Sequence, residues 1–197
     1  MKKVFYLAIA LLIIAILISV TIYLNFFKQV QVELAAPGLE SVIGNAKKTI
    51  YVSSKSFSNG STIPAKYTCD GDNTSPQITI SNVPPQAKSV VLIVYDPDAP
   101  GGIFYHWIVY NLSGLVINLG EGESQRGKLL QGLNDFGFIG YGGPCPPKGD
   151  KPHRYVFVAL ALDIESNWGS GLHPEDVLEK VKGHVIAYGY LVGFYRR

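Results

Sequence analysis

The stretch SVVLIVYDPDAPGGIFYHWIVYNL, residues 89–112, decides the fold. Residues 89–95 and 104–112 are two apolar runs rich in β-branched and aromatic residues, so each predicts a strand at the centre of a sheet. The prolines and glycines between them suit a connecting loop. Asp96 ends the first run and His106 lies two residues into the second. Their side chains are therefore expected to meet at one rim of the sheet.

Further strand signals occur along the chain, mostly separated by glycine, proline or asparagine. They lie at 49–53, 77–80, 154–162 and 188–195. One helix is expected between His173 and Gly183, where a proline and two acids suit a first turn and the glycine can end the helix. The fold class is therefore mainly β, with one or two peripheral helices.

The chain begins with an apolar stretch, Val4–Phe27, that carries no charged side chain. As a helix it would span roughly 36 Å, enough to cross a hydrocarbon core of about 30 Å. Lys2 and Lys3 precede it and Lys28 follows, which favours a cytoplasmic N-terminus with the rest of the chain outside. Residues 1–28 are thus expected to form a transmembrane anchor, with a signal peptide as the alternative.

Two further segments follow this stretch. Residues 29–48 mix polar residues with Ala-Ala-Pro-Gly, show little periodicity and are expected to be a linker. Residues 49–197 are expected to form one folded domain. Within it, the glycine-rich loop at 121–151 is long for a compact domain, and such loops are usually functional.

The charge of the outer domain argues against nucleic acid as a partner. The chain has 17 Lys and Arg against 15 Asp and Glu, and setting aside the three lysines near the anchor leaves 14 against 15. No cluster of basic residues that would follow a phosphate backbone is present in the sequence.

The two cysteines, Cys69 and Cys145, form no Cys-x-x-Cys motif, which excludes a zinc ribbon or a thioredoxin motif. In an exported domain a disulfide is favoured. It would close a loop of about 75 residues, for which the chain-entropy model gives about 4 kcal/mol. The alternative is that both are ordinary core residues.

A second group of polar residues lies in GYGGPCPPKGDKPHRY, residues 140–155. Its glycines permit close backbone approach, its prolines stiffen the loop, and successive N–H groups can form an anion-binding nest. His153 and Tyr155 add donors. Asp96 could hold one histidine in a fixed tautomer, or raise its pKa so that it meets an anion as a cation. We therefore predict a small rigid anion pocket that uses His106 and His153, although a histidine near a strand end is commonly structural.

Several motifs, in order, carry a family resemblance. They are YTCDGDNTSPQITISNVP, DPDAP, HWIVYNL, GLNDFGFIGYGGPCPPKG and HRYVFVALALD. Together they resemble the phosphatidylethanolamine-binding protein family, and most closely its prokaryotic branch of Raf kinase inhibitor-like proteins. The resemblance covers about 51–195, which is nearly the whole outer domain.

This resemblance implies a Greek-key β-sandwich with peripheral helices and a small pocket for phosphate-like groups, such as phospholipid heads. The residues that it assigns to the pocket are Asp96, His106, Gly142, Gly143, Pro146, Pro147, His153 and Tyr155, with Asp70 on the same rim. It also places Cys69 and Cys145 near the pocket, which favours the disulfide.

In function, the resemblance implies a non-enzymatic binding or regulatory protein without a cofactor. The predicted anchor would place it on the outer face of the membrane. Its expected partner is a phosphate-like anion or a phospholipid head group, and a serine protease is a further expected partner. Kinase inhibition is not carried over, because the link between DPDAP and His106 is short. The C-terminus, LVGFYRR, lacks the additional helix of animal members, so a ligand-gating role of such a helix is not carried over either.

Two alternatives remain open. One is a structural cell-surface domain whose pocket is vestigial. The other is a metal-dependent hydrolase, because Asp96, His106 and His153 form a set of two histidines and one carboxylate that can hold a metal. No His-Glu-x-x-His motif supports it, and Gly169-Ser170-Gly171 lacks the first glycine of a nucleophile elbow.

Overall fold

The computed structural model describes residues 6, 13–23 and 39–197. The folded domain belongs to a compact unit that spans Gly38–Arg197. This unit begins before Thr49, the expected domain start, because α2 (Glu40–Ile43) and β1 (Lys47–Lys48) are part of it. β1 pairs in parallel with the C-terminal strand, with Lys47 opposite Ala187.

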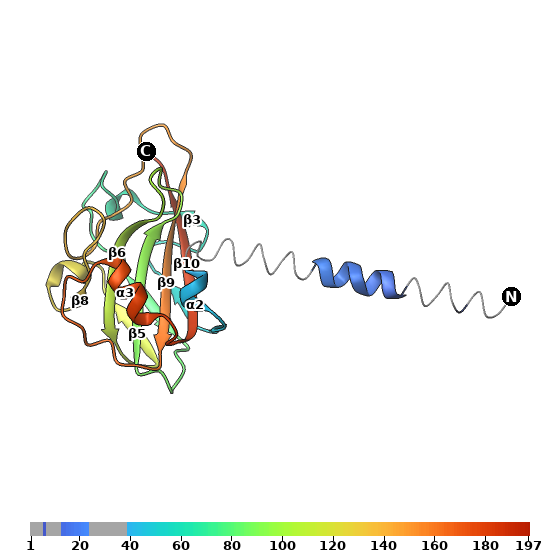
Figure 1. Cartoon of the computed structure of the whole chain (residues 1–197). Coiled ribbons are helices and arrows are strands. Elements are labelled where there is room, and N and C mark those ends of the chain that lie inside the picture. The colour runs from blue at the N-terminus through green and yellow to red at the C-terminus, as the bar shows by residue number, and fades with distance from the viewer. Residues whose placement is uncertain (1–5, 7–12, 24–38) are drawn as a thin grey trace. The chain divides into compact units, whose positions relative to one another are not determined.

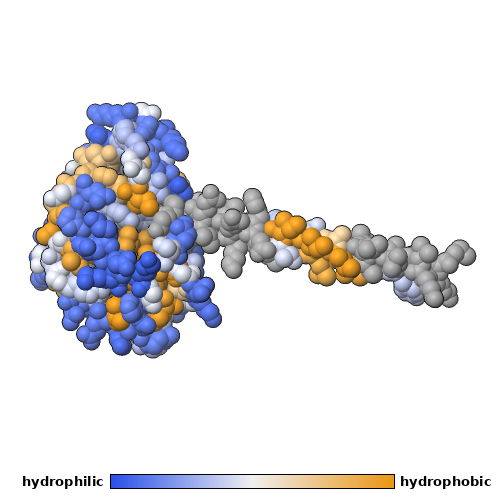
Figure 2. Space-filling model, viewed as in Figure 1, coloured by the Kyte–Doolittle hydropathy of each residue, from blue (hydrophilic) through white to orange (hydrophobic). Residues whose placement is uncertain are grey.

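The expected transmembrane helix over Val4–Phe27 is not supported and is corrected here. Within residues 6, 13–23 and 39–197, no helix is both long enough and apolar enough to cross a bilayer. Residues 13–23 are helical with exposed apolar side chains (Figure 2), but a helix of that length covers only about 16 Å. The other residues of the stretch, apart from Tyr6, lie outside the described residues. The predicted membrane anchorage and extracytoplasmic location depended on this helix and are not supported either.

A large mixed sheet forms the frame of the domain (Figure 1). Its strands run in the order β1, β10 (Val185–Tyr195), β9 (His153–Leu162), β5 (Ser89–Asp96), β6 (Phe104–Leu112) and β8 (Leu130–Gln131), and β3 (Ser61–Thr62) also pairs with β10. The central strand β5 is antiparallel to both of its neighbours, β6 and β9. The two apolar runs of the decisive stretch are thus neighbours in the sheet, as the sequence predicted.

A smaller antiparallel sheet packs against the large one. It consists of β2 (Tyr51–Ser53), β4 (Ile78–Ser81) and β7 (Val116–Leu119). Side chains from both sheets form one core cluster that includes Ile80 and Ile117 from the small sheet and Leu92 and Phe157 from the large one. The mainly β sandwich is therefore confirmed.

Helices cover the other face of the large sheet, where α2 and α3 (Pro174–Val181) lie across its strands in Figure 1. Val177 and Val181 of α3 are fully buried. Because both faces of β5 are covered, all its residues are buried, which explains its continuous apolar sequence. Two short 3₁₀ helices, at Ala65–Tyr67 and Ser124–Arg126, lie in the connections.

Candidate binding pocket

Strand register brings the predicted polar residues to one end of the large sheet. Tyr95 of β5 pairs with Val156 of β9, so Asp96 at the end of β5 lies beside the start of β9. Since side chains alternate along a strand, Asp96 shares the inner face of Val94, and His153 shares the inner face of Tyr155. Three of the four predicted groups are thus placed together by simple alternation.

His106 reaches the same face through a β-bulge. Val94 pairs with Trp107, but the next residue of β5, Tyr95, pairs with Tyr105, so His106 is the extra residue of β6. A bulge re-aims the side chain that it carries. The His106 ring accordingly lies 5.2 Å from the ring of Tyr155, centroid to centroid, on the inner face.

These groups line a cavity of about 190 Å³. Its wall consists of Asp96, Ala99, Pro100, Phe104, His106, Phe136, Cys145, Pro146, Pro147, His153 and Tyr155. A larger open cleft, of about 620 Å³, lies along β3 and the end of β10 and is lined by exposed residues such as Lys151 and Arg196. We take the smaller cavity as the candidate site because the buried polar groups face it.

Asp96 holds His153 in the wall of the cavity. Its Oδ2 lies 2.7 Å from His153 Nδ1, and its Oδ1 accepts the N–H of Asp98 at 2.8 Å. Burial raises the pKa of the Asp96 carboxyl, while the hydrogen bond from His153 opposes that shift. Asp98 in turn accepts two hydrogen bonds from the Arg154 guanidinium, both at 2.8 Å, which lower the pKa of Asp98 and fix the turn. The orienting role predicted for Asp96 is thus directed at His153.

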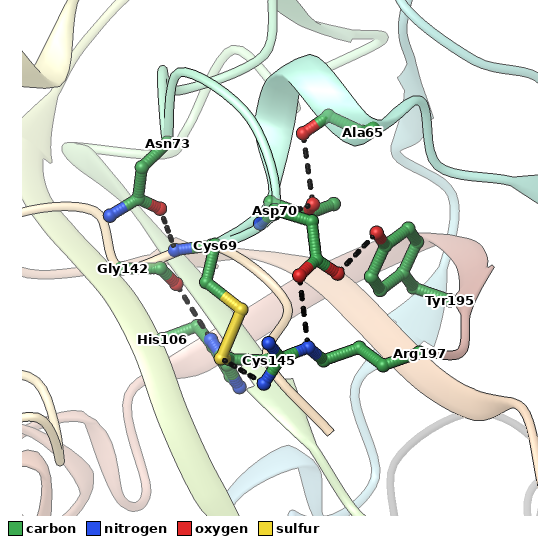
Figure 3. Close-up of a disulfide and its surroundings, with 11 residues drawn as sticks. Ala65, Cys69, Asp70, Asn73, His106, Gly142, Cys145, Tyr195 and Arg197 are labelled. Carbon is green, nitrogen blue, oxygen red and sulfur yellow. Dashed lines mark hydrogen bonds and ion pairs between the residues drawn. A yellow bond between two sulfur atoms is a disulfide. The ribbon is translucent and has the colours of Figure 1, made fainter. Parts of the chain in front are cut away.

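A backbone carbonyl, not Asp96, holds His106. His106 Nδ1 lies 2.6 Å from the carbonyl oxygen of Gly142, and the residue is 3% exposed (Figure 3). Burial lowers the pKa of His106 to about 4, against the opposite effect of the Gly142 and Gly143 carbonyls. The ring is therefore neutral at pH 7, with Nδ1–H donating to Gly142 and Nε2 left as an acceptor. For His106, burial and the Gly142 carbonyl thus favour a neutral ring in one fixed tautomer.

Tyr155 contributes an unmatched donor. It is 1% exposed, and its hydroxyl is the single buried side-chain nitrogen or oxygen without a hydrogen-bond partner in the part of the chain that the structure describes. Burial raises the pKa of this hydroxyl, and the negative charge and acceptor oxygens of the nearby Asp96, which lie outside normal hydrogen-bond geometry, raise it further, so it keeps its proton. An orphaned buried donor in a cavity wall is rare and marks a place for a ligand or water.

The predicted pocket glycines lie behind the wall. The N–H of Gly142 donates to the His106 carbonyl at 2.9 Å, and the N–H of Gly143 donates to Asn73 Oδ1 at 2.6 Å. These two amides are therefore engaged within the chain and do not form the expected nest. A side chain at Gly142 would collide with the ring of Phe136, so glycine is required by close packing.

The predicted disulfide between Cys69 and Cys145 is confirmed, with 5.4 Å between the Cα atoms (Figure 3). Cys145 lines the cavity, whereas Asp70 does not. Asp70 instead accepts hydrogen bonds from Tyr195 Oη at 2.7 Å and from Arg197 Nε at 3.0 Å, and the first of these lowers the pKa of Asp70. Asp70 and the disulfide thus tie the 69–73 segment to the C-terminus and to the pocket loop.

One feature of the site was missed by sequence reasoning. The aromatic lining by Phe104 and Phe136 was not predicted, although Phe104 lies in the stretch 89–112 and Phe136 in a quoted motif; their rings lie 4.7 Å apart, centroid to centroid. A metal ion held by Asp96, His106 and His153 was one of the alternatives that the sequence left open. In residues 6, 13–23 and 39–197 no cluster of three or more His, Cys, Asp or Glu side chains is arranged to hold a metal ion.

Comparison with known sequences gives one consistent result. The family model of the phosphatidylethanolamine-binding proteins matches residues 53–196. A UPF0098 protein from Pyrococcus horikoshii is 44% identical over 160 residues, which cover 78% of this chain and 80% of that protein. A UPF0098 protein from Chlamydia trachomatis is 48% identical over 151 residues, 74% of this chain and 98% of that protein.

Solved structures agree. A crystal structure from Chlamydia trachomatis, described as a phosphatidylethanolamine-binding protein homologue, is 46% identical with a TM-score of 0.70 and covers 77% of this chain and 99% of its own. YbcL of Escherichia coli, described as a new member of the mammalian family, is 36% identical with a TM-score of 0.70, covering 76% and 99%. The matched region of the sequence contains all four polar pocket residues.

Proposed function

The chain belongs to the phosphatidylethanolamine-binding protein family, and from this premise we propose that its pocket binds the phosphoryl group of a small molecule or of a lipid head group. In this proposal the protein is a binding and regulatory module, not an enzyme. The observation that carries it is the unpartnered Tyr155 hydroxyl, a buried donor in the wall of a preformed cavity.

The size of the cavity supports a small ligand group. At about 190 Å³ it is smaller than the roughly 300–1,000 Å³ of pockets that enclose drug-sized ligands. A phosphoryl group with a short substituent fits a cavity of about 190 Å³, whereas a whole lipid does not. The wall is also stiff, because prolines, the disulfide and the Asp98–Arg154 pair hold its segments.

The proposal is tested by calorimetric titration of the full chain with inorganic phosphate and with phosphoethanolamine. We expect saturable binding by the wild type that is lost in His106→Ala. His184→Ala is the matched control, because the His184 ring is 43% exposed and pairs with Asp163 away from the pocket. Circular dichroism of each variant verifies that it is folded. No binding by a folded wild type would overturn the proposal and favour a structural domain with a vestigial pocket.

Serine protease inhibition stays a prediction of the family resemblance. The described loops offer no observation that favours it over the pocket, so it is not part of the proposed function. A titration that fails with both phosphoryl compounds would make protease inhibition assays the next experiment.

A further inference from the structure

The cavity is unusual for an anion site because its wall carries no permanent cation. None of the described residues that line it is Lys or Arg, and one of them is the buried acid Asp96. A fully ionised oxyanion would therefore meet the Asp96 carboxylate, the His153 ring that Asp96 holds, and the neutral imidazole of His106, with one hydroxyl donor from Tyr155. If the pocket binds a phosphoryl group, as proposed above, the composition of this wall determines which protonation state of that group it accepts.

His106 presents an acceptor to the cavity. Its Nδ1 is committed to the Gly142 carbonyl oxygen at 2.6 Å, and the Gly143 carbonyl lies near the same ring. Nε2 is thus the ring nitrogen that is available to a ligand. A lone pair in this position needs a donor, since a buried acceptor without one costs about 1–3 kcal/mol.

The charged groups around His106 also favour a ligand that donates a proton to Nε2. Asp96 faces the cavity from β5, and His153 and Tyr155 face it from β9. Asp150, from the loop before β9, lies 3.6 Å from His153 Nε2 through its Oδ2. Two carboxylates thus flank His153, and a ligand that brings extra negative charge is disfavoured relative to one that brings a proton.

We infer that the pocket takes a phosphoryl group in its singly protonated form, with the P–OH donating to His106 Nε2 and a second oxygen accepting the Tyr155 hydroxyl. The ligand class is therefore hydrogen phosphate monoesters, and sulfate esters of the same shape are rejected. Specificity comes from the acceptor that the Gly142 carbonyl creates by fixing the His106 tautomer.

Methyl phosphate and methyl sulfate form the matched pair of probes. The second ionisation of a phosphate monoester occurs near pH 6, so at pH 5.5 methyl phosphate is mostly a monoanion with one O–H group. Methyl sulfate has the same charge and nearly the same shape but no such proton. We expect methyl phosphate to bind the full chain about tenfold to a hundredfold more tightly, which corresponds to one unmatched buried acceptor.

Two further measurements bear on the role of His106. Raising the pH from 5.5 to 7.5 should weaken methyl phosphate binding, because the protonated ester becomes scarce, and should leave methyl sulfate binding unchanged. In His106→Gln the side-chain amide offers a donor as well as an acceptor, so the preference for phosphate should disappear. Nitrogen-15 NMR of the wild-type complex should show a neutral His106 with its proton on Nδ1.

The outcomes separate the two proposals. If neither probe binds the folded wild type, the proposed function fails and the inference fails with it. If both probes bind with equal affinity, or if His106 is protonated on both nitrogens in the complex, the pocket is an anion site and only the inference is overturned. The probe comparison needs no variant, so it decides the question even if His106→Gln does not fold.

Discussion

Two buried polar clusters lie near β6, and they differ in how completely their hydrogen bonds are made. The closed cluster is formed by Trp107, Tyr110, Ser124 and Gln131. Gln131 Oε1 accepts from Trp107 Nε1 at 2.7 Å and from Ser124 Oγ at 2.6 Å, and Tyr110 Oη lies 3.1 Å from the Gln131 carbonyl oxygen. No buried side-chain atom of this cluster lacks a partner in the described part of the chain.

The open cluster is formed by Asp96, His106, His153 and Tyr155. It is as deeply buried, yet the Tyr155 hydroxyl has no hydrogen-bond partner within the described residues. A closed network stabilises the fold, whereas an open one keeps an energetic cost that only a ligand can remove. We therefore expect substitutions in the closed cluster to change stability alone, and substitutions in the open cluster to change ligand affinity.

The largest expected effect comes from the disulfide, which fastens the wall of the open cluster. Replacing Cys69 and Cys145 with serine removes a link across a sequence separation of 76 residues. The chain-entropy model gives a loss of about 4 kcal/mol in the free energy of unfolding, measured by guanidinium denaturation. Phosphate binding should weaken as well, while native tryptophan fluorescence, to which Trp107 of the closed cluster contributes together with Trp168, should not change. A loss below about 1 kcal/mol would mean that the backbone bonds between the two segments suffice.

The next effect is a dependence of stability on pH that belongs to the open cluster. Burial holds the pKa of His106 at about 4, below its ordinary value of 6.5. Between these values the unfolded chain binds a proton that the native ring does not, so the free energy of unfolding falls as the pH falls from 6.5 to 4. The loss is on the order of 3 kcal/mol.

The raised pKa of Asp96 acts with the opposite sign, so the measurement must isolate His106. Urea denaturation at several pH values, on the wild type and on His106→Asn, gives the difference between the two curves. That difference should shrink as the pH falls through this window. A constant difference would contradict a neutral buried ring.

A smaller effect, confined to stability, is expected from the closed cluster. Gln131→Ala leaves Trp107 Nε1 and Ser124 Oγ without their shared acceptor, which should cost about 2 kcal/mol of unfolding free energy. Gln86→Ala is the matched control, because Gln86 is exposed, and it should change stability by less than about 0.5 kcal/mol. Phosphate affinity should be unchanged in both variants. Weakened binding in Gln131→Ala would show that the two clusters are not independent.

Much of the frame could be predicted from the sequence. The buried strands β5, β6 and β9 follow from continuous apolar runs, and α3 follows from its proline and acids in the first turn. The short strands β1, β3 and β8 could not be found, because two-residue strands have no periodicity of their own. They exist only through their partners in the sheet.

The open cluster was predicted in its members and less well in its chemistry. Alternation along β5 and β9 suffices to bring Asp96 and His153 together. The position of His106 depends on a bulge, and its neutral state depends on burial and on the Gly142 carbonyl, none of which has a sequence signal. Asp70 belongs to a quoted motif, but its carboxylate accepts hydrogen bonds from Tyr195 and Arg197 at the far end of the chain, and no sequence pattern indicates these contacts. Hydropathy likewise predicted a transmembrane helix that the described residues do not support.

One pair of variants tests the comparison most directly, because Tyr155→Phe and Tyr110→Phe remove the same atom from the two clusters. Tyr110 Oη donates to the Gly169 carbonyl at 2.7 Å, so its loss should cost about 1 kcal/mol of unfolding free energy and leave methyl phosphate affinity unchanged. Tyr155→Phe removes an unpaired hydroxyl and should leave stability unchanged or raise it by about 1 kcal/mol, while methyl phosphate affinity falls about tenfold. Equal destabilisation by both variants, with unchanged affinity in Tyr155→Phe, would contradict the claim that the open cluster is kept open for a ligand.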